Sequence, residues 1–266
     1  MQMCVDYSHV DNLIKDLTIA NLPHSNIIVG ESGSGKHTLV KRLSDNLELP
    51  LYDITDKISQ EVIEEIYLSS QIAMYIIDGN QISIKDQNTL LKFIEEPSAS
   101  IYIFILVDNI LQLLPTVRNR CIQIKIPPYY DEELEAFSSD YLYLMVFRTP
   151  GLIQKAKELD LGKLIDYQNK IIASIAKANL SNVLSIKDKI KVEIPQIESN
   201  YDIFFRVFET VLLEHMRNDA SPLYRDMYRC VDQYSIQCRI PKVVTENMFI
   251  RFLLDFKAIA DGYKRN

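Results

Sequence analysis

A glycine-rich turn between an apolar run and a helical pattern contains the residues of this sequence most clearly suited to chemistry. The turn reads Gly30-Glu31-Ser32-Gly33-Ser34-Gly35-Lys36, after the apolar run 26–29 and before the helical pattern 39–43. Glycines let successive backbone N–H groups point at one phosphate, and the helix that follows presents its positive dipole end to the same anion. The lysine adds a point charge that reaches the terminal phosphates. We therefore expect a P-loop that binds a nucleotide.

The position after the lysine departs from the usual P-loop. A Ser or Thr normally stands there and ligates Mg²⁺, whereas this chain has His37, with Thr38 one place later. Mg²⁺ prefers oxygen ligands, so we interpret His37 as a solvent-facing substitute. The residues that we expect around the nucleotide in this stretch are Gly30, Ser32, Gly33, Ser34, Gly35, Lys36, His37 and Thr38.

Asp78 closes a second apolar run, 74–77, downstream of the P-loop. P-loop ATPases carry a carboxylate at the end of such a strand, and it holds Mg²⁺ through water; we expect this role for Asp78. In hydrolysing members a Glu follows and polarises the attacking water, but here Gly79 follows, so the catalytic base is missing. We expect nucleotide to bind and its turnover to be slower by orders of magnitude. The alternative is that Asp78 merely caps the next turn.

Strand-like and helical patterns alternate from the N-terminus to residue 127. The near-continuous apolar character of the strands indicates an α/β fold in which helices cover both faces of a parallel sheet. The strand ends would then carry the site. We expect strands at 26–30, 51–54, 73–78, 101–107 and 121–126, and helices at 11–17, 59–68 and 86–96.

Two helical regions follow the α/β domain 1–127. Pro127-Pro128 marks the boundary, since each proline restricts its neighbour and removes a donor. We expect a small helical lid over 128–161 and a helical domain over 162–266 with four or five amphipathic helices. Phenylalanines at helical spacing predict that this helical domain has a core of its own. The alternative is that they pack against sister subunits. Helical or apolar segments are expected at 131–137, 141–147, 150–159, 164–178, 181–192, 202–217, 224–237 and 245–263.

The bulk composition is that of a soluble globular protein with 266 residues, of which 47% are hydrophobic and 24% charged. A net charge of −7 argues against a protein that grips nucleic acid with its whole surface. No apolar run reaches the about 18 residues of a membrane helix, so we expect no membrane contact. Four cysteines without a CxxC pair predict neither a disulfide framework nor a zinc site.

Three motifs in series carry a resemblance to a known family. They are Asn88-Thr89-Leu90-Leu91-Lys92-Phe93-Ile94-Glu95-Glu96-Pro97, the apolar strand 103–107, and Leu114-Pro115-Thr116-Val117-Arg118-Asn119-Arg120-Cys121. This succession resembles the AAA+ subunits of DNA sliding-clamp loaders, which include the bacterial delta-prime and gamma subunits and the small subunits of replication factor C. The resemblance covers roughly residues 24–127, is weaker over 128–161 and is architectural beyond. Asn119 replaces the serine of the family's motif, and the zinc insert of the bacterial subunits is absent.

The resemblance implies roles for further residues. Arg120 looks like the arginine finger that reaches, in trans, the nucleotide of a neighbouring subunit, a role that suits the planar, always-charged guanidinium. The alternative is a solvated or salt-bridging arginine. Asp108 and Asn109 stand at the first-sensor position, and we expect Asn109 to contact the γ-phosphate because Asp108 would repel it. Where hydrolysing subunits have a second-sensor arginine, this chain offers only Gln154 and Lys155.

The function that these expectations describe is that of a largely structural subunit of a clamp-loading ring. It would bind ATP or ADP with Mg²⁺, donate Arg120, assemble through its C-terminal collar, and act with the other clamp-loader subunits, the sliding clamp and primer–template DNA. We expect a cytoplasmic location in a bacterial or virus-infected cell, or the nucleus if the source is eukaryotic. Whether Lys41, Arg42, Lys85 and Lys92 contact DNA stays an open question, because isolated cations on a protein surface usually only interact with solvent.

Two alternatives stay open. The first is an active ATPase motor subunit of the same ring, in which Asp78 would act with Asn80 or Asn109 to position water. The second, more remote, is an unrelated P-loop kinase for a small molecule, for which no acceptor-binding cluster of carboxylates or arginines is evident in the sequence.

Overall fold

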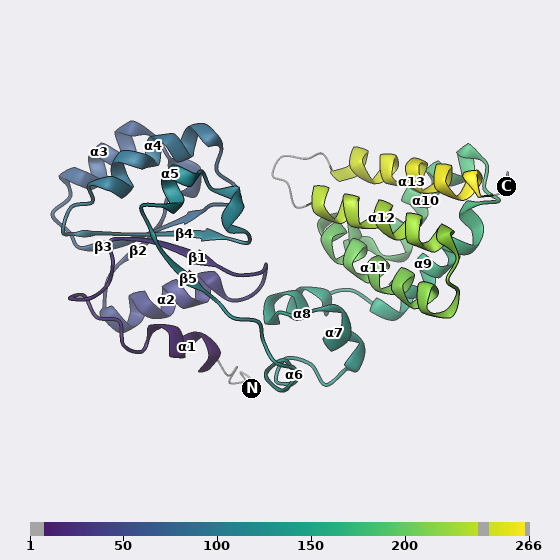
Figure 1. The fold of residues 1–266 in the computed structure, drawn as a ribbon, viewed down its shortest axis with the longest axis horizontal. Coiled ribbons are helices and arrows are strands. Elements are labelled where there is room, and N and C mark those ends of the chain that lie inside the picture. The colour runs from purple at the N-terminus through teal and green to yellow at the C-terminus, as the bar shows by residue number, and fades with distance from the viewer. Residues whose placement is uncertain (1–7, 239–244, 264–266) are drawn as a thin grey trace. The chain divides into compact units, whose positions relative to one another are not determined.

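The computed structural model describes residues 8–238 and 245–263, which form two units (Figure 1). The first, here called the sheet unit, takes the described residues up to Ser139 together with Arg148–Gly151. The second, the helical unit, takes Asp140–Phe147 and the described residues from Leu152 onward. The three-part division by function, with boundaries after residues 127 and 161, stays a prediction.

A five-stranded sheet forms the centre of the sheet unit. Its strands are β1 (Ser25–Val29), β2 (Leu51–Asp53), β3 (Ala73–Asp78), β4 (Ile101–Val107) and β5 (Ile122–Lys125). The strand order is β2-β3-β4-β1-β5, and every paired neighbour is parallel. Val29 is in register with Val107, and Asp78 with Leu106. The residues that follow β1, β3 and β4 therefore emerge at one edge of the sheet.

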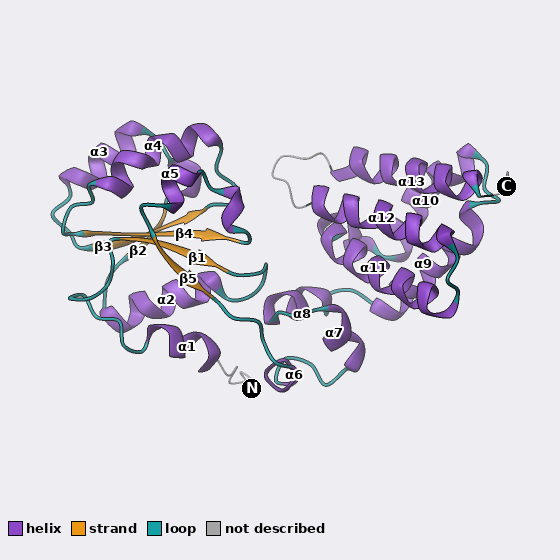
Figure 2. Ribbon diagram, viewed as in Figure 1, coloured by secondary structure: helices purple, strands orange, loops and turns teal. Residues whose placement is uncertain are grey.

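Helices cover both faces of this sheet, as Figure 2 shows. One face carries α1 (Ser8–Ile14) and α2 (Lys36–Leu47). The other carries α3 (Gln60–Leu68), α4 (Ile84–Glu95) and α5 (Pro115–Arg118). Successive residues of a strand point to opposite faces, so Ile27 joins the core beneath α3 and α4 while Ile28 joins the core beneath α2. The predicted α/β class, with a parallel sheet covered on both faces, is confirmed.

The helical unit has its own aromatic core. Phe204 contacts Phe205, Phe208, Phe249 and Phe252 with ring centroids 5.2–6.2 Å apart, and all five side chains are fully buried. These phenylalanines therefore serve the core of the chain itself. The unit's helices are α7 (Tyr141–Val146), α9 (Leu161–Ile175), α10 (Leu180–Glu193), α11 (Tyr201–Asn218), α12 (Pro222–Gln237) and α13 (Thr245–Gly262).

Several short elements complete the chain. Helix α6 (Asp131–Glu135) belongs to the sheet unit, and α8 (Pro150–Ala156) begins in the sheet unit and ends in the helical unit. In the described part of the chain, 3₁₀ turns lie at η1 (Thr55–Lys57), η2 (Ile110–Gln112) and η3 (Pro195–Ser199). Among the described helices, none combines the length and the apolar character that crossing a membrane requires.

Candidate functional site

The P-loop leads from the end of β1 into the first turn of α2. Its path depends on Gly33 and Gly35, whose φ angles of 75° and 93° lie in the left-handed region that favours glycine. The hydroxyl of Ser34 is buried inside this turn and has no hydrogen-bond partner among the described residues. Left-handed glycines, an unpaired buried hydroxyl and a helix N-terminus are the parts of a phosphate cradle, so the residues present fit a nucleotide phosphate.

Lys36 begins α2 and is the cation of this cradle. Its side chain is only 8% exposed, and its ammonium group donates to the carbonyl oxygens of Gly30 at 2.7 Å and Glu31 at 3.1 Å. A third contact, of 2.7 Å, joins it to the carboxylate of Asp108. The structure thus brings the predicted lysine into the turn, together with the carboxylate of Asp108, for which the sequence predicted no contact with this lysine.

The next two residues of α2 differ in exposure. His37 is exposed and Thr38 half-buried. The exposure of His37 agrees with its interpretation as a solvent-facing residue, although its ring also lines the hollow described below.

Three contacts hold the outer side of the P-loop through its carbonyl oxygens. The hydroxyl of Tyr129 donates to Ser34 at 2.9 Å, the hydroxyl of Thr149 to Ser32 at 2.8 Å, and the amide of Gly151 to Gly33 at 2.9 Å. All of these residues belong to the sheet unit. Sequence reasoning missed these contacts, because the partners lie about 100 residues away along the chain.

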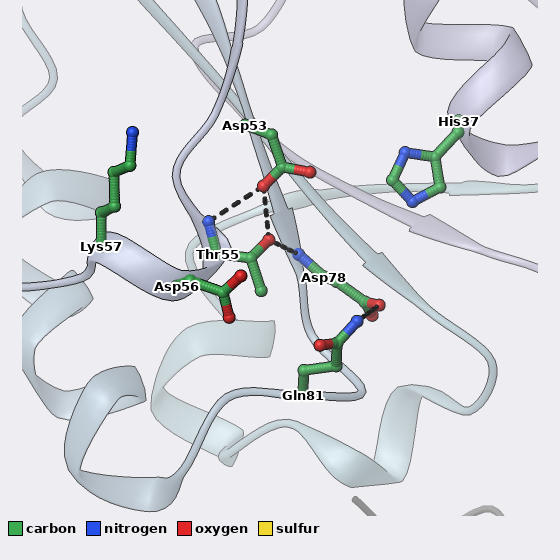
Figure 3. Close-up of a pocket in the computed structure, with 7 residues that line it drawn as sticks. All are labelled: His37, Asp53, Thr55, Asp56, Lys57, Asp78 and Gln81. Carbon is green, nitrogen blue, oxygen red and sulfur yellow. Dashed lines mark hydrogen bonds between the residues drawn. The ribbon is translucent and has the colours of Figure 1, made fainter.

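Asp78 ends β3 and faces a polar hollow of about 250 Å³ (Figure 3). Its carboxylate accepts hydrogen bonds from the backbone and side-chain amides of Asn80 at 3.0 and 2.9 Å and from Gln81 at 2.5 Å. Its backbone amide lies 2.8 Å from the hydroxyl of Thr55, which in turn donates to Asp53 at 2.7 Å. The residues that line the hollow are His37, Asp53, Thr55, Asp56, Lys57, Asp78 and Gln81.

The hollow brings His37 and Asp78 together, but it does not form a protein cage for a metal ion. Within the described residues, no group of three or more His, Cys, Asp or Glu side chains is placed to hold a metal. Mg²⁺ commonly binds through one or two carboxylates, several waters and substrate phosphates. The single carboxylate of Asp78 fits this second pattern, in which waters and nucleotide phosphates supply the other ligands.

The residue after Asp78 is buried against the sheet. A Cβ atom added to Gly79 would lie 3.0 Å from Cγ2 of Ile105 and 3.1 Å from the carbonyl oxygen of Leu106, and closer still to Val107. No side chain fits at this position without displacing β4. The packing of the sheet therefore leaves no room for a glutamate side chain at position 79.

The two first-sensor candidates take different positions. The Asn109 side chain caps η2, accepting a hydrogen bond from the amide of Leu111 at 2.9 Å, and it is exposed. Asp108 instead reaches Lys36. The structure brings Asp108, and not Asn109, to the P-loop lysine; contact between Asn109 and a γ-phosphate stays a prediction.

Arg120 follows α5 and is 40% exposed. Its Nε atom lies 2.5 Å from the carboxylate of Glu95 at the end of α4, and its Nη1 atom donates to the carbonyl oxygen of Thr116 at 2.8 Å. The chain itself therefore engages the Nε and Nη1 atoms of the guanidinium. Among the described residues Nη2 has no hydrogen-bond partner, which leaves this nitrogen available to solvent or to another molecule.

The remaining candidates lie on the surface or in local ion pairs. Lys155 pairs with Asp202 at 2.7 Å within the helical unit, and Gln154 is exposed. Arg42 pairs with Asp11, while Lys41, Lys85 and Lys92 are exposed. The cysteines at 121 and 230 are free and buried, and Cys4 lies outside the described residues.

Comparisons with known proteins agree with the motifs. The family described as "DNA polymerase III, delta subunit" matches residues 51–130. DNA polymerase III subunit delta' of Bacillus subtilis (strain 168) is 22% identical over 192 residues, which cover 67% of this chain. DNA polymerase III subunit gamma of Buchnera aphidicola subsp. Baizongia pistaciae is 24% identical over 211 residues, which cover 65% of this chain. The chain spans only 58% and 56% of the lengths of these relatives.

A solved structure shares the fold along nearly the whole chain. It is the DNA polymerase III gamma subunit-related protein of Thermotoga maritima, with a TM-score of 0.50, 14% identity, and coverage of 95% of this chain and 99% of that one. This likeness supports the architecture of the chain. In sequence the chain is thus similar to subunits of DNA polymerase III, and its motifs resemble those of the AAA+ clamp-loader subunits.

Proposed function

We propose that this chain is a clamp-loader subunit that holds ATP or ADP at its P-loop mainly as a structural ligand and offers Arg120 to the nucleotide of a neighbouring subunit. The ring would load a sliding clamp onto primer–template DNA, in the cytoplasm of a bacterial or virus-infected cell or in a eukaryotic nucleus. In this proposal residues 128–161 act as the lid and residues 162–266 as the collar. The names of the relatives, delta' and gamma subunits of DNA polymerase III, support the assignment.

The proposal rests on a phosphate cradle that lies beside the end of β3, where the next residue has no room for the side chain of a catalytic base. Gly33, Gly35 and Lys36 have the geometry of the cradle. Gly79 is packed against β4, where a side chain would collide with Ile105 and Val107. Phosphoryl transfer to water depends on positioning and on a group that orients the water. A site of this form supports nucleotide binding without efficient turnover.

Different residues of the chain would bind the phosphates and the Mg²⁺ ion. Lys36 and the backbone amides of the P-loop would compensate the charge of the phosphates, and Asp78 would hold Mg²⁺ through water while the phosphates supply the other ligands. His37 cannot replace the usual Ser or Thr oxygen at the metal. The carbonyl oxygens of the P-loop would stay turned away from the phosphates, because Tyr129, Thr149 and Gly151 donate hydrogen bonds to them.

The environment of Arg120 supports its role toward a second subunit. It lies on the surface, and Glu95 and Thr116 contact its Nε and Nη1 atoms, while Nη2 has no partner among the described residues. An arginine held in this way loses less side-chain freedom when it meets a phosphate.

Two measurements with two variants test the proposal. The isolated chain should bind ATP and ADP by titration calorimetry without hydrolysing ATP, and Lys36→Ala should abolish binding. Mixed with the other clamp-loader subunits of its source, Arg120→Ala should slow single-turnover hydrolysis at the neighbouring site by about a thousandfold. Lys36→Ala should change that rate much less. Lys125→Ala, which removes an exposed cation of β5, is the control.

The alternatives predict other results. Brisk hydrolysis that Lys36→Ala abolishes would favour an ATPase motor subunit. Transfer of phosphate to a small molecule by the isolated chain would favour a kinase. If a ring that contains Arg120→Ala hydrolysed ATP at the wild-type rate, the proposed role of Arg120 as an arginine finger would be wrong.

A further inference from the structure

The P-loop lysine has all of its donors engaged by the chain itself. An ammonium group has three N–H donors, and Lys36 directs them to the carbonyl oxygens of Gly30 and Glu31 and to the carboxylate of Asp108. Two of these acceptors are neutral, so the only formal negative charge among them is that of Asp108. This carboxylate occupies the position at the lysine that an anionic ligand would take.

Asp108 reaches this position because of the strand order. It is the first residue after β4, and Val107 in β4 is in register with Val29 in β1, which precedes the P-loop. The carboxyl ends of neighbouring parallel strands meet at one edge of a sheet. A residue 72 positions from Lys36 in sequence therefore lies within 2.7 Å of its ammonium group.

Asn80 fixes Asp108 on the other side. The backbone amide of Asp108 donates to the side-chain carbonyl of Asn80 at 2.9 Å, and the side-chain amide of Asn80 lies 3.5 Å from the Asp108 carboxylate. The same side-chain amide donates to Asp78 at 2.9 Å. Lys36, Asp108, Asn80 and Asp78 thus form one connected polar network that spans the ends of β3 and β4, and Asp108 has no need of a ligand to be held in place.

We propose that Asp108 is an internal competitor for nucleotide phosphate at Lys36, and that it sets both the affinity and the ATP-versus-ADP preference of this P-loop. A phosphate that approaches Lys36 must break the ion pair and then lie beside the displaced carboxylate. Like charges about 4 Å apart repel strongly near a partly buried site. Because the P-loop lysine serves the β- and γ-phosphates, the penalty is larger for ATP, which carries the additional γ-phosphate charge. This inference rests on the proposed nucleotide binding and adds the residue that tunes it.

The test is nucleotide affinity measured by titration calorimetry with Mg-ATP and Mg-ADP, on the full chain. Asp108→Asn keeps the size of the side chain and removes the charge. We expect it to bind ATP at least about tenfold more tightly than the wild type, and to gain less for ADP. Asp108→Glu keeps the charge and should leave both affinities low. Asp45→Asn removes one charge from an exposed position of α2 and should leave both affinities unchanged.

A second readout does not depend on affinity. Without nucleotide, Asp108→Asn should melt at a lower temperature than the wild type, because Lys36 loses its counter-ion in a buried position. The rise in melting temperature on adding ATP should be larger in the variant. Circular dichroism of each variant identifies any that fails to fold, and Asp108→Ser then serves as a second neutral replacement.

The outcomes separate this inference from the proposed function. ATP binding by Asp108→Asn that is at least about tenfold tighter than that of the wild type supports it, including the case in which the wild type binds nothing measurable. Unchanged or weaker ATP binding by a folded Asp108→Asn, with the wild type still binding and Lys36→Ala not, overturns the inference and leaves the proposed function standing. If neither the wild type nor the neutral variants bind either nucleotide, both proposals are wrong.

Discussion

The amide of Gly151, in the first turn of α8, donates a hydrogen bond to the carbonyl oxygen of Gly33, at the tip of the P-loop, across 2.9 Å. The two backbones approach so closely that a Cβ atom on Gly151 would lie 2.7 Å from Cα of Gly33 and 2.9 Å from its oxygen. These residues are 118 positions apart in the chain. Helix α8 therefore contacts the P-loop backbone directly, through a glycine that lies outside the P-loop motif.

Gly151→Ala should weaken the P-loop without altering any residue that we expect to contact nucleotide. The added methyl group has to push the 148–151 segment away from Gly33, and overpacking of this kind costs about 1–3 kcal/mol. We expect a lower melting temperature and weaker ATP binding, measured by thermal denaturation and calorimetry. Gly162→Ala is the control, since its Cβ atom would meet only the side chain of Asp160 at 3.4 Å and alanine favours the helix. Equal melting temperatures for the two variants would refute this account.

Gly79→Glu should not restore ATP hydrolysis, although it recreates the residue that follows the strand-end aspartate in active ATPases. The new side chain would displace Ile105 and Val107 in β4, so we expect a loss of stability of about 3 kcal/mol or more and no gain in single-turnover rate. Gly79→Ala should lose less. Urea unfolding and a rapid-quench ATPase assay check the two effects, and a stable, hydrolytically active Gly79→Glu would disprove the prediction.

Glu95→Gln should separate stability from function at Arg120. The two side chains of this ion pair are 41% and 40% exposed, and exposed pairs contribute between about 0 and 1 kcal/mol. We therefore expect the free energy of unfolding to change by less than about 0.5 kcal/mol. Hydrolysis at the neighbouring site of an assembled ring should nevertheless fall, because Arg120 loses the group that orients it. Glu96→Gln alters the adjacent exposed carboxylate and should leave that rate at the wild-type value.

Cys121 and Cys230 should react slowly with alkylating reagents in the folded protein. Burial raises the pKa of each thiol to about 12, and the thiolate is the reacting form. At pH 8 the thiolate fraction is then lower by about a thousandfold than for an ordinary thiol. Mass spectrometry after iodoacetamide treatment should find both unmodified at pH 8 and labelled faster as the pH rises toward 10. In urea both should react readily at pH 8, and rapid labelling of either in the native chain would contradict the prediction.

The pKa directions also predict how stability depends on pH. The folded state disfavours ionisation of these two thiols, so their contribution to stability is complete below the pKa of an unfolded thiol, about 8.5. As the pH rises from there toward about 12, the unfolded chain loses protons first and the free energy of unfolding decreases. Urea unfolding should give a smaller free energy of unfolding at pH 10 than at pH 7.5. Cys121→Ser and Cys230→Ser should each reduce this difference between the two pH values.

The sequence by itself determined the elements whose signal is local. The apolar runs 73–78 and 101–107 coincide with β3 and β4, since a strand buried on both faces tolerates few polar residues. The start of α4 was predicted at Asp86, whereas the helix begins at Ile84 with Ser83 as its cap. The reciprocal bonds between Ser83 and Asp86 are a capping box, so a Ser-x-x-Asp spacing in the sequence already contained that boundary.

Tertiary structure decided which of these residues meet. Strand order is not written in the hydrophobic pattern, and it is the order β3-β4-β1 that brings Asp108 to Lys36 and leaves Asn109 to cap η2. In the same way, the pairing of Arg120 with Glu95 and the contact of Gly151 with Gly33 join segments that are distant in sequence. The physical reason is that a motif reflects backbone conformation over a few residues, whereas the charge and packing around a side chain depend on every strand and helix that folds against it.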